Sequence, residues 1–157
     1  MKRTLGLTLL LFATLFSCMR QEKPLPAELS RAESVMWEHP DSALSILRSM
    51  PQSSLSSGKN YATWALLLAQ ARDKVYGKRL PDSLNIPSSD KLVQDAMDYF
   101  EKEGNLKRMA QTYYYKGQLL KDQKKITEAM PFFLKSKEMM TKLDEPLFTY
   151  LICQSLG

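Results

Sequence analysis

The amino-acid sequence predicts an all-α fold, and three observations carry this prediction. No stretch alternates apolar and polar residues for long, as a half-exposed strand would. β-branched residues are scarce after residue 27. Apolar residues recur three and four positions apart in several windows, which is the spacing of the buried face of a helix. The length of 157 residues suits one domain of ordinary size.

Proline, glycine and capping residues set the ends of the expected helices. We expect a first helix that carries Leu29, Ala32, Val35 and Met36 and ends before Pro40. A second helix is capped by Asp41 and Ser42 and ends before Pro51. A third runs from Asn60 to a stop at Gly77, and a fourth begins at Ser89 or Asp90 and ends at Gly104 and Asn105. The third is apolar on most sides, which predicts a central, well-buried helix. Residues 80–89 are expected to form a connector.

Beyond the fourth helix, residues 109–121 and 126–143 are expected to form the clearest antiparallel pair, and a last helix begins near Pro146. Of the three adjacent tyrosines Tyr113, Tyr114 and Tyr115, one or two should pack in the core and one should point elsewhere, because neighbours on a helix are about 100° apart. Trp37, Trp64 and Cys153 are expected to be core residues.

Composition excludes several classes of protein. A charged fraction of 25% beside 44% hydrophobic residues excludes wholesale disorder. Two cysteines are too few for a disulfide scaffold, and no cluster of Cys and His could hold a structural zinc. The single histidine, His39, precedes Pro40 and is expected to be a solvent-exposed turn residue. The sequence contains no recognisable catalytic constellation, so we expect no enzyme, no cofactor and no metal.

The first 17 residues predict an export signal. Lys2 and Arg3 precede an apolar run from Leu5 to Phe16, which is shorter than the roughly 20 residues of a membrane span. The run is followed by Ser17 and Cys18, and this ending resembles the lipobox of bacterial lipoproteins, although Phe16 stands where a small residue is usual. The alternative is an ordinary secretory signal with a chance cysteine.

The lipobox resemblance implies cleavage of a signal peptide, residues 1–17, and attachment of lipid to Cys18. Residues 18–27, with Pro24 and Pro26, would then be a lipidated tether that holds the chain on a membrane of the cell envelope, facing the periplasm or the cell surface. A nucleic-acid partner is not expected for an exported protein.

An internal repeat refines the expected fold. Ala96 and Phe100 recur 33 residues later as Ala129 and Phe133, and Gly117 lies twelve residues before Ala129. Helix pairs with a period of 33–34 and small residues at these positions resemble the tetratricopeptide repeat (TPR). The resemblance implies antiparallel helix pairs stacked as a short right-handed solenoid over residues 28–157. The repeat at 105–143 matches best, with departures at Lys116 and Leu120, where Leu and Tyr are usual.

The chain ends inside a further unit, since Leu156 and Gly157 look like the small-residue site of another first helix. We therefore expect an incomplete last repeat and a truncated product or the front part of a longer protein. The order of lipobox, "PAELSRAESVMWEHPDSALSIL", "YATWALLLAQARDK" and "DAMDYFEKEGNLKRMAQTYYYKGQLLKDQ" resembles the N-terminal sensor part of envelope TPR lipoproteins and regulators of Gram-negative bacteria. A regulatory role is implied by this resemblance only.

The TPR resemblance also suggests where a partner would bind. The groove of such repeats is lined by first-helix positions that correspond here to Gln111, Tyr114, Gln118 and Lys121 and to the adjoining Asp122. Families that clamp a peptide carboxylate use Lys, Asn and Arg there, which this chain does not match. An aromatic ring beside amide and Lys side chains could hold an extended peptide or a sugar.

The sequence is therefore consistent with two functions. The first is a non-enzymatic module that binds a protein or peptide in the groove, and the alternative is a glycan-binding outer-membrane lipoprotein of the nutrient-uptake type. Residues 105–142 carry nine Lys and Arg against three acidic residues. This excess predicts either an anionic partner or a solvated helix surface.

Overall fold

The computed structural model describes residues 24–77 and 89–156, and all the regular secondary structure in this part of the chain is helical. The all-α prediction is confirmed. The predicted signal peptide, Cys18, most of the tether, most of the connector and Gly157 lie outside the described residues. In chain order the elements are α2 (Ala27–Val35), α3 (Pro40–Ser49), a 3₁₀ turn η2 (Gln52–Leu55), α4 (Gly58–Tyr76), α5 (Ser89–Glu103), α6 (Leu106–Asp122), α7 (Ile126–Lys142) and α8 (Pro146–Leu156).

The helix ends are set by capping residues, of which the stop at Gly77 was predicted, whereas the side-chain caps Ser57 and Asn105 were not. The Ser57 side chain accepts a hydrogen bond from the backbone N–H of Asn60 at the start of α4, and Asn105 does the same for Arg108 in α6. Gly77 ends α4 with a φ of +53°, which favours glycine. α3 begins at Pro40, before the expected Asp41, because the fixed φ of proline suits the first position of a helix.

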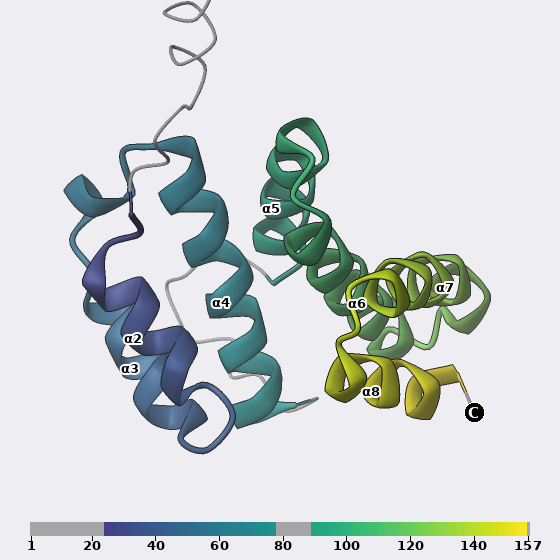
Figure 1. Ribbon diagram of the computed structural model, residues 1–157. Helices are drawn as coiled ribbons and strands as arrows, with labels where there is room; N and C mark the ends of the chain where they lie inside the picture. The colour runs from purple at the N-terminus through teal and green to yellow at the C-terminus, as the bar shows by residue number, and fades with distance from the viewer. Residues whose placement is uncertain (1–23, 78–88, 157) are drawn as a thin grey trace, which may run out of the picture.

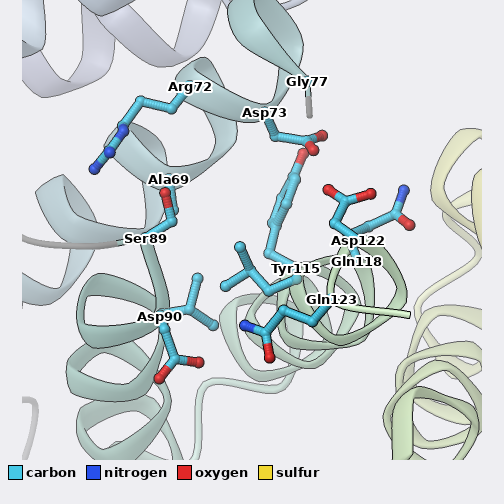
Figure 2. A pocket seen from close by; sticks show the side chains of 12 residues that line it. Ala69, Arg72, Asp73, Gly77, Ser89, Asp90, Tyr115, Gln118, Asp122 and Gln123 are labelled. Atoms are coloured by element: carbon cyan, nitrogen blue, oxygen red, sulfur yellow. The ribbon is translucent and has the colours of Figure 1, made fainter. Parts of the chain in front are cut away.

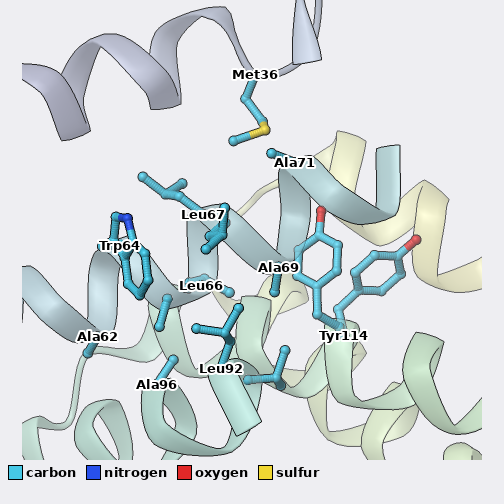
Figure 3. Close-up of a cluster of buried hydrophobic side chains, with 14 of the residues drawn as sticks. Met36, Ala62, Trp64, Leu66, Leu67, Ala69, Ala71, Leu92, Ala96 and Tyr114 are labelled. Carbon is cyan, nitrogen blue, oxygen red and sulfur yellow. The ribbon is translucent and has the colours of Figure 1, made fainter. Parts of the chain in front are cut away.

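Each helix packs against the next one along the chain, and α4 also contacts α2 and α6 (Figure 1). α4 lies between the α2–α3 pair and α5, so apolar residues cover most of its circumference. Leu66 and Leu67 (Figure 3) are buried there, and so is Leu68. Trp64 is buried as well, and its indole N–H donates to the carbonyl of Leu47 at 2.9 Å. The prediction of a central helix is therefore confirmed.

The two repeated sequence positions are buried alike in the two helices that carry them. Ala96 and Phe100 in α5 and Ala129 and Phe133 in α7 each expose 1% or less of their surface. In α6, a Cβ added to Gly117 would lie 2.7 Å from Cε1 of Phe133, so the missing side chain is what lets that ring approach α6. The ring thus fills the space within its own helix pair, α6 and α7.

All three adjacent tyrosines are buried, so the prediction that one would point elsewhere is wrong. The three side chains point in different directions from α6, and another helix lies in each of these directions. Tyr113 donates to Glu101 of α5 at 2.6 Å, Tyr114 lies against Phe148 of α8, and Tyr115 lines a pocket with residues of α4. Burial and Glu101 raise the pKa of Tyr113 to about 12.

Two expected core residues are exposed. Trp37 is 40% exposed because it lies in the turn after α2, where its ring is covered by the ammonium of Lys74, 3.4 Å from the ring centroid, and by the edge of Phe148. Cys153 is exposed because α8 buries the face that carries Phe148 and Ile152. His39 is exposed, as predicted.

The contact of Gly117 with Phe133 makes a first prediction. Gly117→Ala forces the ring to move, at a cost of about 1–3 kcal/mol for overpacking, while the better helix propensity of alanine returns about 1 kcal/mol. We therefore expect a lower free energy of unfolding, measured by urea denaturation. Adding Phe133→Leu should make the double variant more stable than the sum of the single effects. Purely additive effects would contradict the contact.

Candidate functional site

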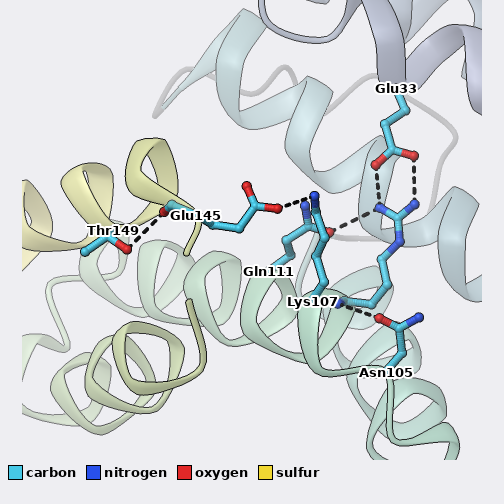
Figure 4. A network of polar contacts seen from close by, with 7 residues as sticks. Glu33, Asn105, Lys107, Gln111, Glu145 and Thr149 are labelled. Atoms are coloured by element: carbon cyan, nitrogen blue, oxygen red, sulfur yellow. Dashed lines mark hydrogen bonds and ion pairs between the residues drawn. The ribbon is translucent and has the colours of Figure 1, made fainter. Parts of the chain in front are cut away.

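The four residues of the predicted groove share one face of α6, on which Gln111 and Tyr114 are buried by other parts of the chain and Gln118 and Lys121 are partly exposed. Gln111 is 4% exposed, and its side-chain oxygen accepts a hydrogen bond from Arg108 at 3.1 Å. The same guanidinium forms two hydrogen bonds with the carboxylate of Glu33 in α2, at 2.8 and 2.7 Å (Figure 4). A bidentate pair of this kind fixes the position of α2 over this end of α6.

Tyr114 lies further along the same face and is 5% exposed. Its ring contacts Phe148 of α8, which in turn contacts Trp37, so the turn after α2 and the helix α8 meet close to it. Its hydroxyl accepts from the amide of Gln118 at 2.8 Å, and Lys121 donates to the backbone carbonyl of Ser155 at 3.2 Å. The structure thus brings the four residues together but engages them within the chain, and their role in binding stays a prediction.

The basic side chains of 105–142 are also largely engaged within the chain. Five of the nine bond to its acidic or carbonyl groups, namely Lys107, Arg108, Lys116, Lys121 and Lys142. Each of these five basic side chains therefore has a partner within the chain. They favour the solvated-surface interpretation of the basic run over a patch for an anionic partner.

A pocket of about 320 Å³ opens where the C-terminal ends of α4 and α6 meet the N-terminal end of α5 (Figure 2). Its size falls within the range of small-ligand sites. The described residues that line it are Ala69, Arg72, Asp73, Gly77, Ser89, Asp90, Val93, Tyr115, Gln118, Leu119, Asp122 and Gln123. Of the predicted groove residues, Gln118 lines this pocket, together with the adjoining Asp122.

Burial and charge perturb the acidic and phenolic groups of the pocket. Burial raises the pKa of the Asp73 carboxyl, the negative charge of Asp122 raises it further, and Lys74 opposes the shift. Burial also raises the pKa of Tyr115 well above its ordinary value, and the charge of Asp73 adds to this. Tyr115 is therefore a neutral phenol at physiological pH, beside carboxylates that can accept hydrogen bonds.

Sequence reasoning missed Asp73 and Tyr115, although one signal was present. Asp73 lies in the last turn of α4 and Asp122 ends α6, where the partial negative charge of the helix terminus disfavours an acidic side chain. Two such violations at neighbouring helix ends mark a place where local stability is sacrificed, and these places are often functional. Finding that the two ends adjoin required the packing of α4 on α6.

Within residues 24–77 and 89–156, no three His, Cys, Asp or Glu side chains come together as a metal site. Among the described helices, none combines the length and apolar character that crossing a membrane requires. No protein-family model, curated protein or solved structure matches this chain.

The ion pair between Glu33 and Arg108 makes a second prediction. Glu33→Ala removes two hydrogen bonds from a guanidinium that is only 12% exposed, so we expect a loss of about 1–3 kcal/mol in the free energy of unfolding. The matched control is Glu38→Ala, since Glu38 is exposed in the turn after α2 and should change stability by about 0.5 kcal/mol or less. Equal effects of the two substitutions in urea denaturation would contradict the role of this pair.

Proposed function

We propose that this chain is a lipid-anchored protein of the cell envelope that acts as a non-enzymatic protein- or peptide-interaction module built from TPR-like helix pairs. The observation that carries the proposal is the equivalent burial of Ala96 and Phe100 with Ala129 and Phe133, one repeat apart. Consecutive packing from α2 to α8 and the close approach of Phe133 to Gly117 support it. Arrays of this kind present their surfaces to protein partners.

The partner-binding surface proposed here differs from the one that the sequence suggests. Because Gln111 and Tyr114 are buried beneath α2 and α8, the open polar surface on α6 is its C-terminal end, where Gln118 and Asp122 line the pocket. A peptide would therefore engage the chain at the junction of α4, α5 and α6. The resemblance to sensor parts of envelope regulators adds the proposal that binding there is a signal for a longer regulator.

The location in the envelope rests on the N-terminal sequence. Lys2, Arg3, the short apolar run and Cys18 together support a lipoprotein signal. Each buried CH₂ of an acyl chain contributes about 0.8 kcal/mol, so several chains on Cys18 would hold the protein on a membrane. The glycan-binding alternative depended on an exposed Tyr114, and since that ring is buried we do not adopt it as a second candidate.

The anchor makes a third prediction, with a control that the chain itself supplies. The full chain, expressed in a Gram-negative bacterium fed alkyne-palmitate, should incorporate label and sediment with membranes. Cys18→Ala should abolish the label and release the protein, because the acceptor thiol is gone. Cys153→Ala removes the only other cysteine, which is exposed, and should keep label and membrane binding.

Label retained by Cys18→Ala, or lost equally from both variants, would contradict the proposed anchor. Label lost from Cys18→Ala without release from the membrane would show that a lipid alone does not hold the chain there.

The binding surface makes a fourth prediction. A photo-crosslinking amino acid placed at Gln123, on the rim of the pocket, should form adducts with an envelope protein or peptide in living cells. The same group at Lys137, on the exposed face of α7, should form none, since that position lies outside the pocket. Adducts at neither position, or equally at both, would count against an interaction role for the pocket.

A further inference from the structure

Two buried positions on α6 carry a polar and an amphipathic side chain where a core helix normally carries aliphatic ones. Gln111 is 4% and Tyr114 is 5% exposed, and the same face continues to the partly exposed Gln118 and Lys121. A buried side-chain amide costs free energy unless it is hydrogen-bonded, so an aliphatic residue at position 111 would serve stability more simply. A local choice that does not serve stability often marks a functional surface.

Two side-chain contacts close the cover over this face, and we call them the clasp. In the first, Glu33 of α2 forms two hydrogen bonds with Arg108 of α6 (Figure 4). In the second, Trp37 in the turn after α2 meets the edge of Phe148 in α8. By contrast, α2 packs against α3 and α4 through its buried apolar residues. The clasp can therefore break without loss of the apolar packing that holds α2 in the chain.

Both contacts of the clasp are accessible from solvent. The Glu33 side chain is 36% exposed in its pair with Arg108, and Trp37 is 40% exposed. The guanidinium of Arg108 also donates to Gln111 at 3.1 Å, so the clasp is joined directly to the covered face. A competing group that reaches the clasp from solvent thus acts on the residues beneath it.

We propose that the clasp is an autoinhibitory contact, which keeps Gln111 and Tyr114 covered until it opens and exposes them to the partner. This regulation rests on the proposed function, because it concerns the helix whose C-terminal end we assign to peptide binding. In the closed chain a peptide reaches Gln118 at the pocket, and in the open chain its contacts extend along α6 to Tyr114 and Gln111. A partner that binds the open form more tightly shifts the equilibrium toward that form.

The closed state can be measured without a known partner, through nitration of tyrosine by tetranitromethane. The full chain is purified from bacterial membranes in detergent, and mass spectrometry identifies each modified tyrosine. Tyr150 is 59% exposed and serves as the internal reference for the reagent. In the wild-type chain we expect Tyr114 to be nitrated far less than Tyr150, because its ring is buried. Tyr113 is bonded to Glu101 of α5 and should stay unmodified unless the chain unfolds.

Variants assign the protection of Tyr114 to the clasp. Glu33→Arg places like charges together, and we expect nitration of Tyr114 to rise about tenfold or more, because hydrogen bonds between charged groups shift an equilibrium by at least that factor. The exchanged pair, Glu33→Arg with Arg108→Glu, restores opposite charges and should return most of the protection. The matched control is Glu38→Arg, which makes the same change of charge at an exposed position in the turn after α2. If circular dichroism shows that Glu33→Arg is unfolded, Glu33→Gln replaces it, with Glu38→Gln as its control.

A photo-crosslinking residue connects the clasp to the partner. Tyr114→p-azidophenylalanine keeps the shape of tyrosine apart from the azide, and the full chain is irradiated in living cells. Adducts with an envelope protein or peptide should become more abundant when the chain also carries Glu33→Arg. The increase should be roughly in proportion to the nitration of Tyr114, because apparent affinity follows the open fraction. Glu38→Arg should give no increase.

The proposal is overturned if wild-type Tyr114 is nitrated as readily as Tyr150, if Glu33→Arg and Glu38→Arg behave alike, or if the exchanged pair restores no protection. It is also overturned if Glu33→Arg raises nitration but not adducts at position 114 while the crosslinker at Gln123 captures a partner. That result leaves the proposed function intact, because the partner then binds at the pocket alone. Adducts from neither position would count against the proposed function and the regulation that rests on it, even where nitration shows that the clasp opens.

Discussion

The enclosure of α6 is the constraint on which the rest of the structure depends. α4, α5 and α7 pack against this helix directly, Glu33 of α2 holds its N-terminal part through Arg108, and Phe148 of α8 lies against Tyr114. Burying three consecutive tyrosines requires partners in three directions, because successive side chains on a helix point about 100° apart. Once these partners are in place, the C-terminal end of α6 is the part that opens to the pocket.

Much of the fold could be predicted from local chemistry. The helix ends follow from Ser57, Asn105 and Gly77, and the buried faces follow from apolar periodicity, because both depend on residues close in sequence. The errors concern contacts between distant segments. Trp37 and Cys153 are residue types that are usually buried, yet no other segment fully covers either side chain.

The candidate site could be predicted only in part, for the same physical reason. A repeat pattern places Gln118 and Asp122 on one helix, and both line the pocket. It cannot show that α2 closes over Gln111 and Tyr114, since that closure depends on a pairing 75 residues apart in sequence. The repeat pattern also cannot show that Asp73 and Asp122 lie near each other, although each is an acidic residue at a helix C-terminus, where a negative charge is unfavourable. In the folded chain both residues line the same pocket.

The central claim is that the turn after α2 and the helix α8 meet over α6 and leave the pocket as its open end. The most direct measurement is a nuclear Overhauser spectrum of the isotopically labelled chain in detergent. The account predicts cross-peaks between the rings of Trp37 and Phe148, whose centroids are 5.7 Å apart. If Trp37 instead showed cross-peaks only to Lys74 and its sequence neighbours, the face of Gln111 and Tyr114 would be open to partners, and the account would be wrong.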